Sequence, residues 1–202
     1  MKESRKMTVP DGDAELLAQF VAAFEVFDDM CSLEVPANLI VRSDEPGFKY
    51  WRPKQVSTPR AALNSLYSEL PARFPPLYES LILSYRWALV GLEAFQLLPN
   101  KPAEDLAPLL SAIMVDPCLF QTLIPAGYVQ FGRGPYSSYD PVCFDIRQRH
   151  KSGEFRVVQI DHEEILCFDR IREVQEIAPS FRELVVQTIM RAEAVRGNRS
   201  SY

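Results

Sequence analysis

The sequence predicts an α+β fold, in which an antiparallel sheet of mixed-length strands in the C-terminal half packs with helices. Two observations lead to this prediction. Through much of the N-terminal half, apolar residues recur at three- and four-residue steps, the period of an amphipathic helix. From Tyr128 onward, short alternating apolar segments separated by turn residues indicate strands, before a final helical pattern. The first helix is expected to form an N-terminal helical extension.

Composition narrows the classes of protein that the chain can belong to. It has 202 residues, of which 47% are hydrophobic and 24% charged, and its net charge is -5. This length and apolar fraction allow a sizeable core and exclude a mainly disordered chain. The negative charge argues against nucleic acid as a direct ligand. With no signal-peptide pattern and no uninterrupted apolar stretch of membrane-spanning length, we expect a cytoplasmic protein without membrane association.

The first helix is expected to begin near Asp13, with Asp11 or Asp13 at its N-cap, and to end before Pro36. Residues 36–57 are rich in proline, which predicts irregular chain with one short strand at 39–42. The apolar face of the helix is expected to contain Leu16, Leu17, Phe20, Phe24 and Phe27.

The middle of the chain is predicted to be mainly helical. Thr58-Pro59 indicates a helix start, because a threonine hydroxyl can cap the helix and proline is tolerated in the first turn. Further helices are expected at 76–87 and 104–115. The apolar run at 89–98 is predicted as a strand.

The last third is predicted as an antiparallel meander closed by a helix. Val142, Phe144 and Ile146 alternate with polar or small residues, which is the period of a half-buried strand. Ser180 and Glu183 have the spacing of a capping box. The expected elements are strands at 128–131, 142–147, 155–160 and 165–168, and a helix that opens at Ser180 and frays from Gly197.

Four cysteines are present, none at the spacing of a zinc site or a redox pair. Each lies among apolar residues, so we expect reduced, buried thiols. Cys143 acting as a nucleophile with His162 as its base is an alternative, although no protease signature surrounds it.

The densest polar cluster is Asp161-His162-Glu163-Glu164, directly after a predicted strand. One interpretation is a polar turn that joins two strands. The other is a metal-ligating or acid–base set. Because the only other histidine is His150, the sequence offers no complete ligand set, and the turn is favoured. No metal or cofactor is therefore predicted.

Two aromatic segments are candidate surfaces for a protein partner. Exposed tyrosines anchor interfaces well because ordering them costs little entropy. Aromatic residues in an irregular segment either cover the core or face a partner. The candidates are Tyr136 and Tyr139 in the loop at 132–140, and Phe48, Tyr50 and Trp51 in the proline-rich stretch.

Three parts of the chain resemble one known family. Residues 70–81, with the run Phe74-Pro75-Pro76, resemble a proline-led helix that enters the domain. Residues 139–145 resemble a strand preceded by a small acidic turn. Residues 157–163 and 178–184 resemble a strand that reaches an Asp-His-Glu turn and a helix that opens with Ser-Phe. On these segments the chain resembles the SUKH superfamily, which includes fungal cell-wall regulators and bacterial toxin-immunity proteins.

The resemblance implies a SUKH-like α+β domain at 58–196, with residues 1–57 as an N-terminal helix and irregular extension and 197–202 as a disordered tail. It also implies a non-enzymatic, immunity-like protein-binding module. The acidic balance suits a basic partner such as a toxin domain. The alternative is a small hydrolase or metal-dependent enzyme centred on Asp161, His162 and Glu163. The sequence leaves the partner's identity and the oligomeric state open.

Overall fold

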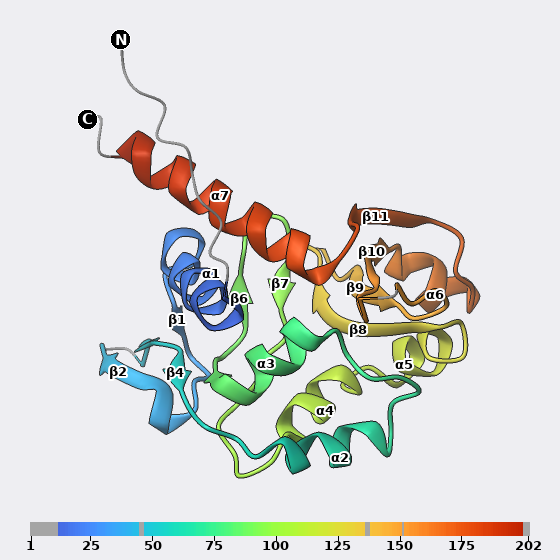
Figure 1. The fold of residues 1–202 in the computed structure, drawn as a ribbon, viewed down its shortest axis with the longest axis horizontal. Coiled ribbons are helices and arrows are strands. Elements are labelled where there is room, and N and C mark those ends of the chain that lie inside the picture. The colour runs from blue at the N-terminus through green and yellow to red at the C-terminus, as the bar shows by residue number, and fades with distance from the viewer. Residues whose placement is uncertain (1–11, 45–46, 136–137, 151, 200–202) are drawn as a thin grey trace.

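The computed structural model describes residues 12–44, 47–135, 138–150 and 152–199. It has the α+β architecture predicted from the sequence. Figure 1 shows α7 along one side of the molecule, α1 beside it, and α2 and α4 on the opposite side.

The described residues form seven α-helices, two short 3-10 helices and eleven strands. The α-helices are α1 (Asp13–Phe27), α2 (Leu63–Tyr67), α3 (Pro76–Ser84), α4 (Ala107–Ile113), α5 (Pro117–Leu123), α6 (His162–Phe168) and α7 (Phe181–Arg199), and the 3-10 helices are η1 (Ala37–Leu39) and η2 (Arg60–Ala62). The strands are β1 (Cys31–Ser32), β2 (Ile40–Ser43), β3 (Lys49–Trp51), β4 (Lys54–Gln55), β5 (Tyr85–Arg86), β6 (Val90–Gly91), β7 (Gln96–Leu97), β8 (Tyr128–Arg133), β9 (Pro141–Asp145), β10 (Arg156–Ile160) and β11 (Val174–Ala178).

The main sheet has six strands in the order β11-β10-β9-β8-β7-β6, so every strand pairs with its neighbours in sequence. All of these pairings are antiparallel, which confirms the predicted meander. Val129 on β8 lies opposite Phe144 on β9, and Cys143 on β9 lies opposite Val158 on β10. Two smaller sheets, β1-β3-β2 and β4-β5, lie in the N-terminal part of the chain.

Strand β9 is buried along its whole length, so the expectation of a half-buried strand is wrong. Val142 and Phe144 face the main core, whereas Cys143 belongs to a second apolar cluster on the other face. That second cluster contains Leu119 and Leu123 of α5 and Ile165 of α6. The sheet therefore carries helices on both faces at this point. Because both faces of β9 are covered, its residues need not alternate between apolar and polar.

Aromatic rings fill the main core between the sheet and helices α3 and α7. Phe131 and Phe144 on neighbouring strands are stacked, with ring centroids 4.2 Å apart. Tyr78 on α3 and Phe181 on α7 meet edge to face at 5.2 Å. Such geometries are the preferred ones for aromatic pairs, and they fix α3 and α7 on the same face of the sheet.

The N-terminal helix is part of this core. Phe20 on α1 lies 6.2 Å from Phe181 in an edge-to-face contact. Asp13 at the start of α1 forms an ion pair with Arg182. Near the other end of α1, Arg196 donates a hydrogen bond to the carbonyl of Ala22. Residues 13–27 are therefore held by α7, and the predicted extension shares its core with the predicted domain.

Two predictions for the middle of the chain need correction. Thr58 does not cap a helix, because its Oγ1 instead accepts a hydrogen bond from Arg86, and the helical turn η2 begins after Pro59. The apolar run at 89–98 is not one strand. It folds into the hairpin of β6 and β7, turned where Glu93 takes a positive φ of 56°.

Near the C-terminus, the strand expected at 165–168 is wrong, because these residues belong to helix α6. The strand follows later as β11, and α5 is a further helix that the periodicity did not reveal. Ser180 caps α7 as the spacing predicts, since its Oγ accepts a hydrogen bond from the backbone N–H of Glu183, one of the two bonds of a capping box. Helix α7 continues to Arg199, so the tail expected from Gly197 is helical up to that residue.

The four cysteines are free thiols, but only Cys143 is fully buried. Cys31 is half-buried, and Cys118 and Cys167 are exposed, which corrects the expectation that all four lie inside. Among the described residues, no helix has both the length and the apolar character that crossing a membrane requires.

Candidate functional site

The polar cluster at 161–164 forms the N-terminus of α6. Asp161 is the N-cap residue, and its Oδ1 accepts a hydrogen bond from the backbone N–H of Glu163 at 2.8 Å. The acidic side chains of Glu163 and Glu164 lie in the first turn, where the helix dipole favours negative charge. The favoured interpretation, a polar turn that joins two strands, is therefore wrong, because the cluster is the capped start of a helix.

Asp140 brings the loop before β9 to this helix start. Its Oδ1 accepts a hydrogen bond from the backbone N–H of His162 at 3.1 Å and lies 2.7 Å from Nδ1 of the same histidine. Its Oδ2 accepts a hydrogen bond from Gln159 on β10 at 3.0 Å. Partial burial alone would raise the pKa of the Asp140 carboxyl, but the hydrogen bonds from His162 and Gln159 outweigh it and hold the pKa below its ordinary value.

The Asp140–His162 pair fixes the orientation of the imidazole. A carboxylate can only accept hydrogen bonds, so Nδ1 carries the proton between the two side chains. In the neutral ring, Nε2 is then the acceptor nitrogen. This is the arrangement found in metal-ligating histidines and in histidines that act as general bases.

Asp140, Asp161 and His162 each offer one ligand atom, and these atoms all lie within 4.8 Å of one another. Asp140 and Asp161 also line a cavity of about 180 Å³, together with Gln159 and Glu173. Glu163 is exposed and does not belong to this group. The predicted set of Asp161, His162 and Glu163 is therefore replaced by one in which Asp140 takes the place of Glu163.

Exposed apolar side chains lie next to Asp140 and along α6. Tyr139, next to Asp140, is 63% exposed, and its ring centroid lies 5.9 Å from that of His162. On α6, Leu166 is 49% exposed and Phe168 is 61% exposed. Leu166 follows His162 by four residues and so lies one turn along the same helix face. We name the residues Tyr139, His162, Leu166 and Phe168 the α6 surface.

The chain around the α6 surface is strongly acidic. Residues 161–176 contain six carboxylates and two arginines. Both arginines pair with Glu164: Arg170 Nε lies 2.6 Å and Arg172 Nη1 lies 3.9 Å from its carboxylate oxygens. Arg170 also lies over the ring of Phe168, 4.9 Å from its centroid. The cations of this segment are therefore engaged within it, and the surface presents net negative charge.

The second predicted surface is only partly available. Trp51 is 1% exposed and belongs to the main core, so its assignment as a partner-binding residue is wrong. Tyr50 is half-buried beneath Arg42, whose guanidinium carbon lies 4.0 Å from the ring centroid. Phe48 is 45% exposed. Of the residues predicted in the loop at 132–140, Tyr139 is exposed, and Tyr136 lies outside the described residues.

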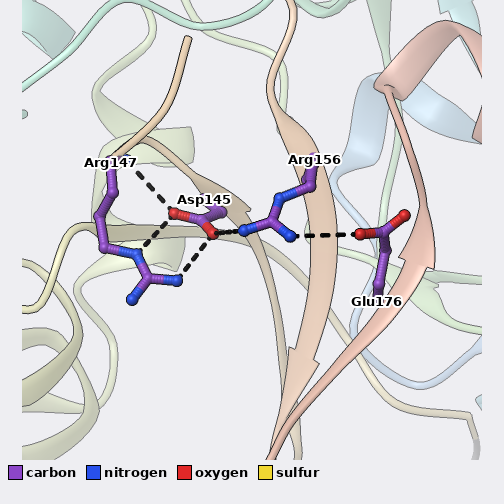
Figure 2. A network of polar contacts seen from close by, with 4 residues as sticks. All are labelled: Asp145, Arg147, Arg156 and Glu176. Carbon is purple, nitrogen blue, oxygen red and sulfur yellow. Dashed lines mark hydrogen bonds and ion pairs between the residues drawn. The ribbon is translucent and has the colours of Figure 1, made fainter.

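A separate charged network lies at the opposite end of strand β9 (Figure 2). Asp145, which is 1% exposed, accepts hydrogen bonds from Nε and Nη2 of Arg147, each at 2.8 Å. It also accepts one from Arg156 on β10 at 2.8 Å, and Arg156 reaches Glu176 on β11 at 3.4 Å. Figure 2 shows the four side chains in a row across the strands. They tie strand ends together rather than forming a cavity.

Cys143 is not placed to act as a nucleophile. It is fully buried in the second apolar cluster, and burial raises the pKa of its thiol well above the ordinary value. A thiol that stays protonated and out of reach of solvent behaves as a small apolar side chain.

No family model matches the chain, and a search of curated proteins found no match. The similarity to the SUKH superfamily therefore remains a prediction from the sequence.

Proposed function

We propose that the protein is a non-enzymatic, immunity-like module that binds a basic protein partner through the α6 surface. The observation that carries this proposal is the exposure of Tyr139, Leu166 and Phe168 around one helix within an acidic segment. Large apolar side chains flanked by charges are typical of protein interfaces. The resemblance to a superfamily of protein-binding scaffolds supports the same function, and a cytoplasmic location belongs to this proposal.

The chemistry of the surface indicates the kind of partner. Tyr139 and Phe168 can fill apolar pockets, while the carboxylates of 161–176 favour a partner rich in lysine and arginine. Opposite charges accelerate encounter and suppress partners of the wrong sign. A basic toxin domain has this character. The hydrogen bonds of Asp140 and Asp161 hold the start of α6 in place, so little ordering of this helix accompanies binding.

The experiment has two stages. The tagged protein is used to capture partners from its own cells, and the affinity of a captured basic protein is then measured for variants. Tyr139→Ala and Phe168→Ala are expected to weaken binding by about tenfold or more each, as loss of an interface anchor does. Met190→Ala is the matched control, because Met190 is 50% exposed but lies on α7.

Other outcomes would place the interface elsewhere or contradict the proposal. Loss of affinity in Phe48→Ala with unchanged binding in Tyr139→Ala and Phe168→Ala would place the interface on the N-terminal sheet. A captured partner with acidic character would contradict the charge argument. Binding that does not weaken as salt rises would contradict it as well, because steering between exposed charges is screened.

One observation favours a second candidate function, a small hydrolase or other metal-dependent enzyme. Asp140, Asp161 and His162 bring two carboxylates and an imidazole within 4.8 Å, a donor set suited to a divalent transition metal. Titration calorimetry with Zn²⁺ and Mn²⁺ tests it. Stoichiometric binding that disappears in Asp161→Asn, with the fold retained, would support this candidate. Absence of binding would leave only the protein-binding function.

A further inference from the structure

Arg86 is a buried cation held by neutral groups. The residue is 2% exposed. Its Nη1 donates hydrogen bonds to the carbonyl oxygens of Ile82, at 2.7 Å, and Tyr85, at 3.1 Å. Its Nη2 donates to Oγ1 of Thr58 at 2.6 Å. Arginine keeps its charge in proteins, so a full positive charge stands at this position in the fold.

The groups around Arg86 offset this charge only in part. Within the described residues, no carboxylate forms an ion pair with Arg86. Ile82 and Tyr85 lie at the C-terminal end of α3, where the helix dipole supplies about half a negative charge. Asn100 donates to the same two carbonyl oxygens, at 2.9 and 2.8 Å, so Arg86 shares them. An uncompensated buried charge is costly, which makes this residue unusual for a purely structural element.

A cavity of about 370 Å³ lies against Arg86. Thr58 lines it as well, and because its Oγ1 accepts from Arg86, its hydroxyl hydrogen remains for another acceptor. Polarisation by the guanidinium makes that hydroxyl a stronger donor. The polar side chains of the lining are Asn38, Lys54, Ser57, Thr58, Arg86 and Glu104.

We propose that this cavity binds the phosphate group of a small phosphorylated molecule. Lysine and hydroxyl donors around one cavity, with the positive charge of Arg86 behind the Thr58 hydroxyl, match an oxyanion that accepts several hydrogen bonds. Lys54 and Glu104 are of opposite sign, so Arg86 sets the net charge of the lining. The cavity is larger than a bare phosphate and is in the range of small-molecule sites, which leaves space for the group attached to the phosphate.

The test is a titration of isotope-labelled protein with inorganic phosphate at constant ionic strength. Binding is measured by the change in backbone amide NMR chemical shifts. Saturable shifts are expected at Ser57, Thr58 and Arg86. Thr58→Val keeps the size of the side chain but removes the hydroxyl, and should weaken binding by about tenfold, the effect of losing a hydrogen bond to a charged group. Thr122→Val is the matched control, because Thr122 is a half-buried threonine on α5 whose hydroxyl donates to Asp169, away from the cavity lining.

Arg86→Met is expected to abolish the saturable shifts. If that variant does not fold, Thr58→Val and Lys54→Met carry the test, since Lys54 is exposed. The proposal is overturned if phosphate produces no saturable shifts at the cavity, or if Thr58→Val binds phosphate as tightly as the unaltered protein. Equal binding of acetate would overturn the assignment of a phosphate group. The protein–partner experiment does not depend on any of these results.

Discussion

Nδ1 of His162 lies 2.7 Å from Oδ1 of Asp140, although the two residues are 22 positions apart in the chain. The contact joins the loop that contains Tyr139 to the helix that contains Leu166 and Phe168. The sequence suggested a partner-binding role for the loop and an acid–base or metal-binding role for the polar cluster. In the fold, both lie at one position, so variants of Asp140 and Tyr139 separate the two functions.

The buried carboxylate of Asp145 makes a pH-dependent contribution to stability. The hydrogen bonds from Arg147 are the main cause that holds the pKa of Asp145 below its ordinary value. Asp145→Asn should lower the free energy of unfolding by about 2 kcal/mol near neutral pH. Because the folded state has the lower pKa, this contribution is present above the unfolded pKa and is lost as pH falls through the folded pKa.

Urea unfolding of both proteins between about pH 7 and pH 2 checks this prediction. The difference between them should shrink below about pH 5. Glu176→Gln is the control, since Glu176 is exposed and meets Arg156 at 3.4 Å, and it should change stability little. A difference between Asp145→Asn and the unaltered protein that stays constant to the lowest pH would contradict the prediction.

Substitution by alanine should lower the stability of the protein at Gly127 but not at Gly197. Gly127 has a φ of +85°, and an added Cβ would lie 2.5 Å from Cγ of Arg147. Arg147 cannot easily move away, because it is held by Asp145 and lies 4.6 Å from the ring centroid of Tyr128. Gly127→Ala should therefore destabilise the protein by about 1–3 kcal/mol.

At Gly197, inside α7, an added Cβ meets nothing within 4 Å. Alanine is the better helix former, so Gly197→Ala should be neutral or stabilise the protein by up to about 1 kcal/mol. The Tm of each variant, measured by thermal unfolding, tests both predictions. Equal shifts of Tm in the same direction would show that the space around these glycines does not govern their effect.

The hydroxyl of Tyr67 joins three parts of the N-terminal half. It donates to Oε1 of Glu79 at 2.7 Å and accepts from the backbone N–H of Phe74 at 3.0 Å. Burial, followed by the hydrogen bond with Glu79, raises the pKa of Tyr67. Among the described residues, Tyr67→Phe leaves the buried Glu79 carboxylate with Arg60 as its one side-chain partner, and should cost about 2 kcal/mol in chemical unfolding.

Tyr139→Phe is the control for this measurement, since within the described residues the exposed Tyr139 has no hydrogen bond through its hydroxyl. It should leave the free energy of unfolding unchanged. A Tyr67→Phe protein as stable as the unaltered one would mean that Glu79 finds an equivalent partner.

The four thiols should react at different rates. Cys118 and Cys167 are exposed, Cys31 is half-buried and Cys143 is buried. Burial raises the pKa of Cys143, and the thiolate is the form that reacts. Timed alkylation with iodoacetamide, read by mass spectrometry, should label Cys118 and Cys167 first and Cys143 only on unfolding. Labelling of Cys143 as fast as Cys118 in the folded protein would refute this order.

Much of the fold could be predicted from local signals. The helix at 13–27, the helix cap at Ser180 and the hairpin that contains β9 and β10 are all present. Errors arose where tertiary packing overrides local pattern. The apolar run at 165–168 is too short for its periodicity to distinguish a strand from a helix. In the structure it belongs to a helix that is capped by Asp161. Trp51 lies in an irregular proline-rich stretch, where the sequence does not show whether an aromatic side chain is buried or exposed. The tertiary structure places it in the core.

The candidate site could be predicted only in part, because its members come from separate segments. Asp161 and His162 stand out as adjacent polar residues, and Tyr139 as an aromatic residue in a loop. Asp140 was not among the predicted site residues, because nothing local pairs it with His162. The pairing depends on the antiparallel register of β9 and β10, which places the start of one strand beside the end of the other.

The sequence by itself determined the α+β class, the meander and the positions of the longest helices, because hydrophobic period and capping act within a few residues. Only the tertiary structure decided which polar groups meet. The Asp140–His162 pair, the Asp145 network and the cavity at Arg86 each join residues from different elements. Hydrogen bonds and charge pairs of this kind act over a few ångströms, and folding sets which residues come that close.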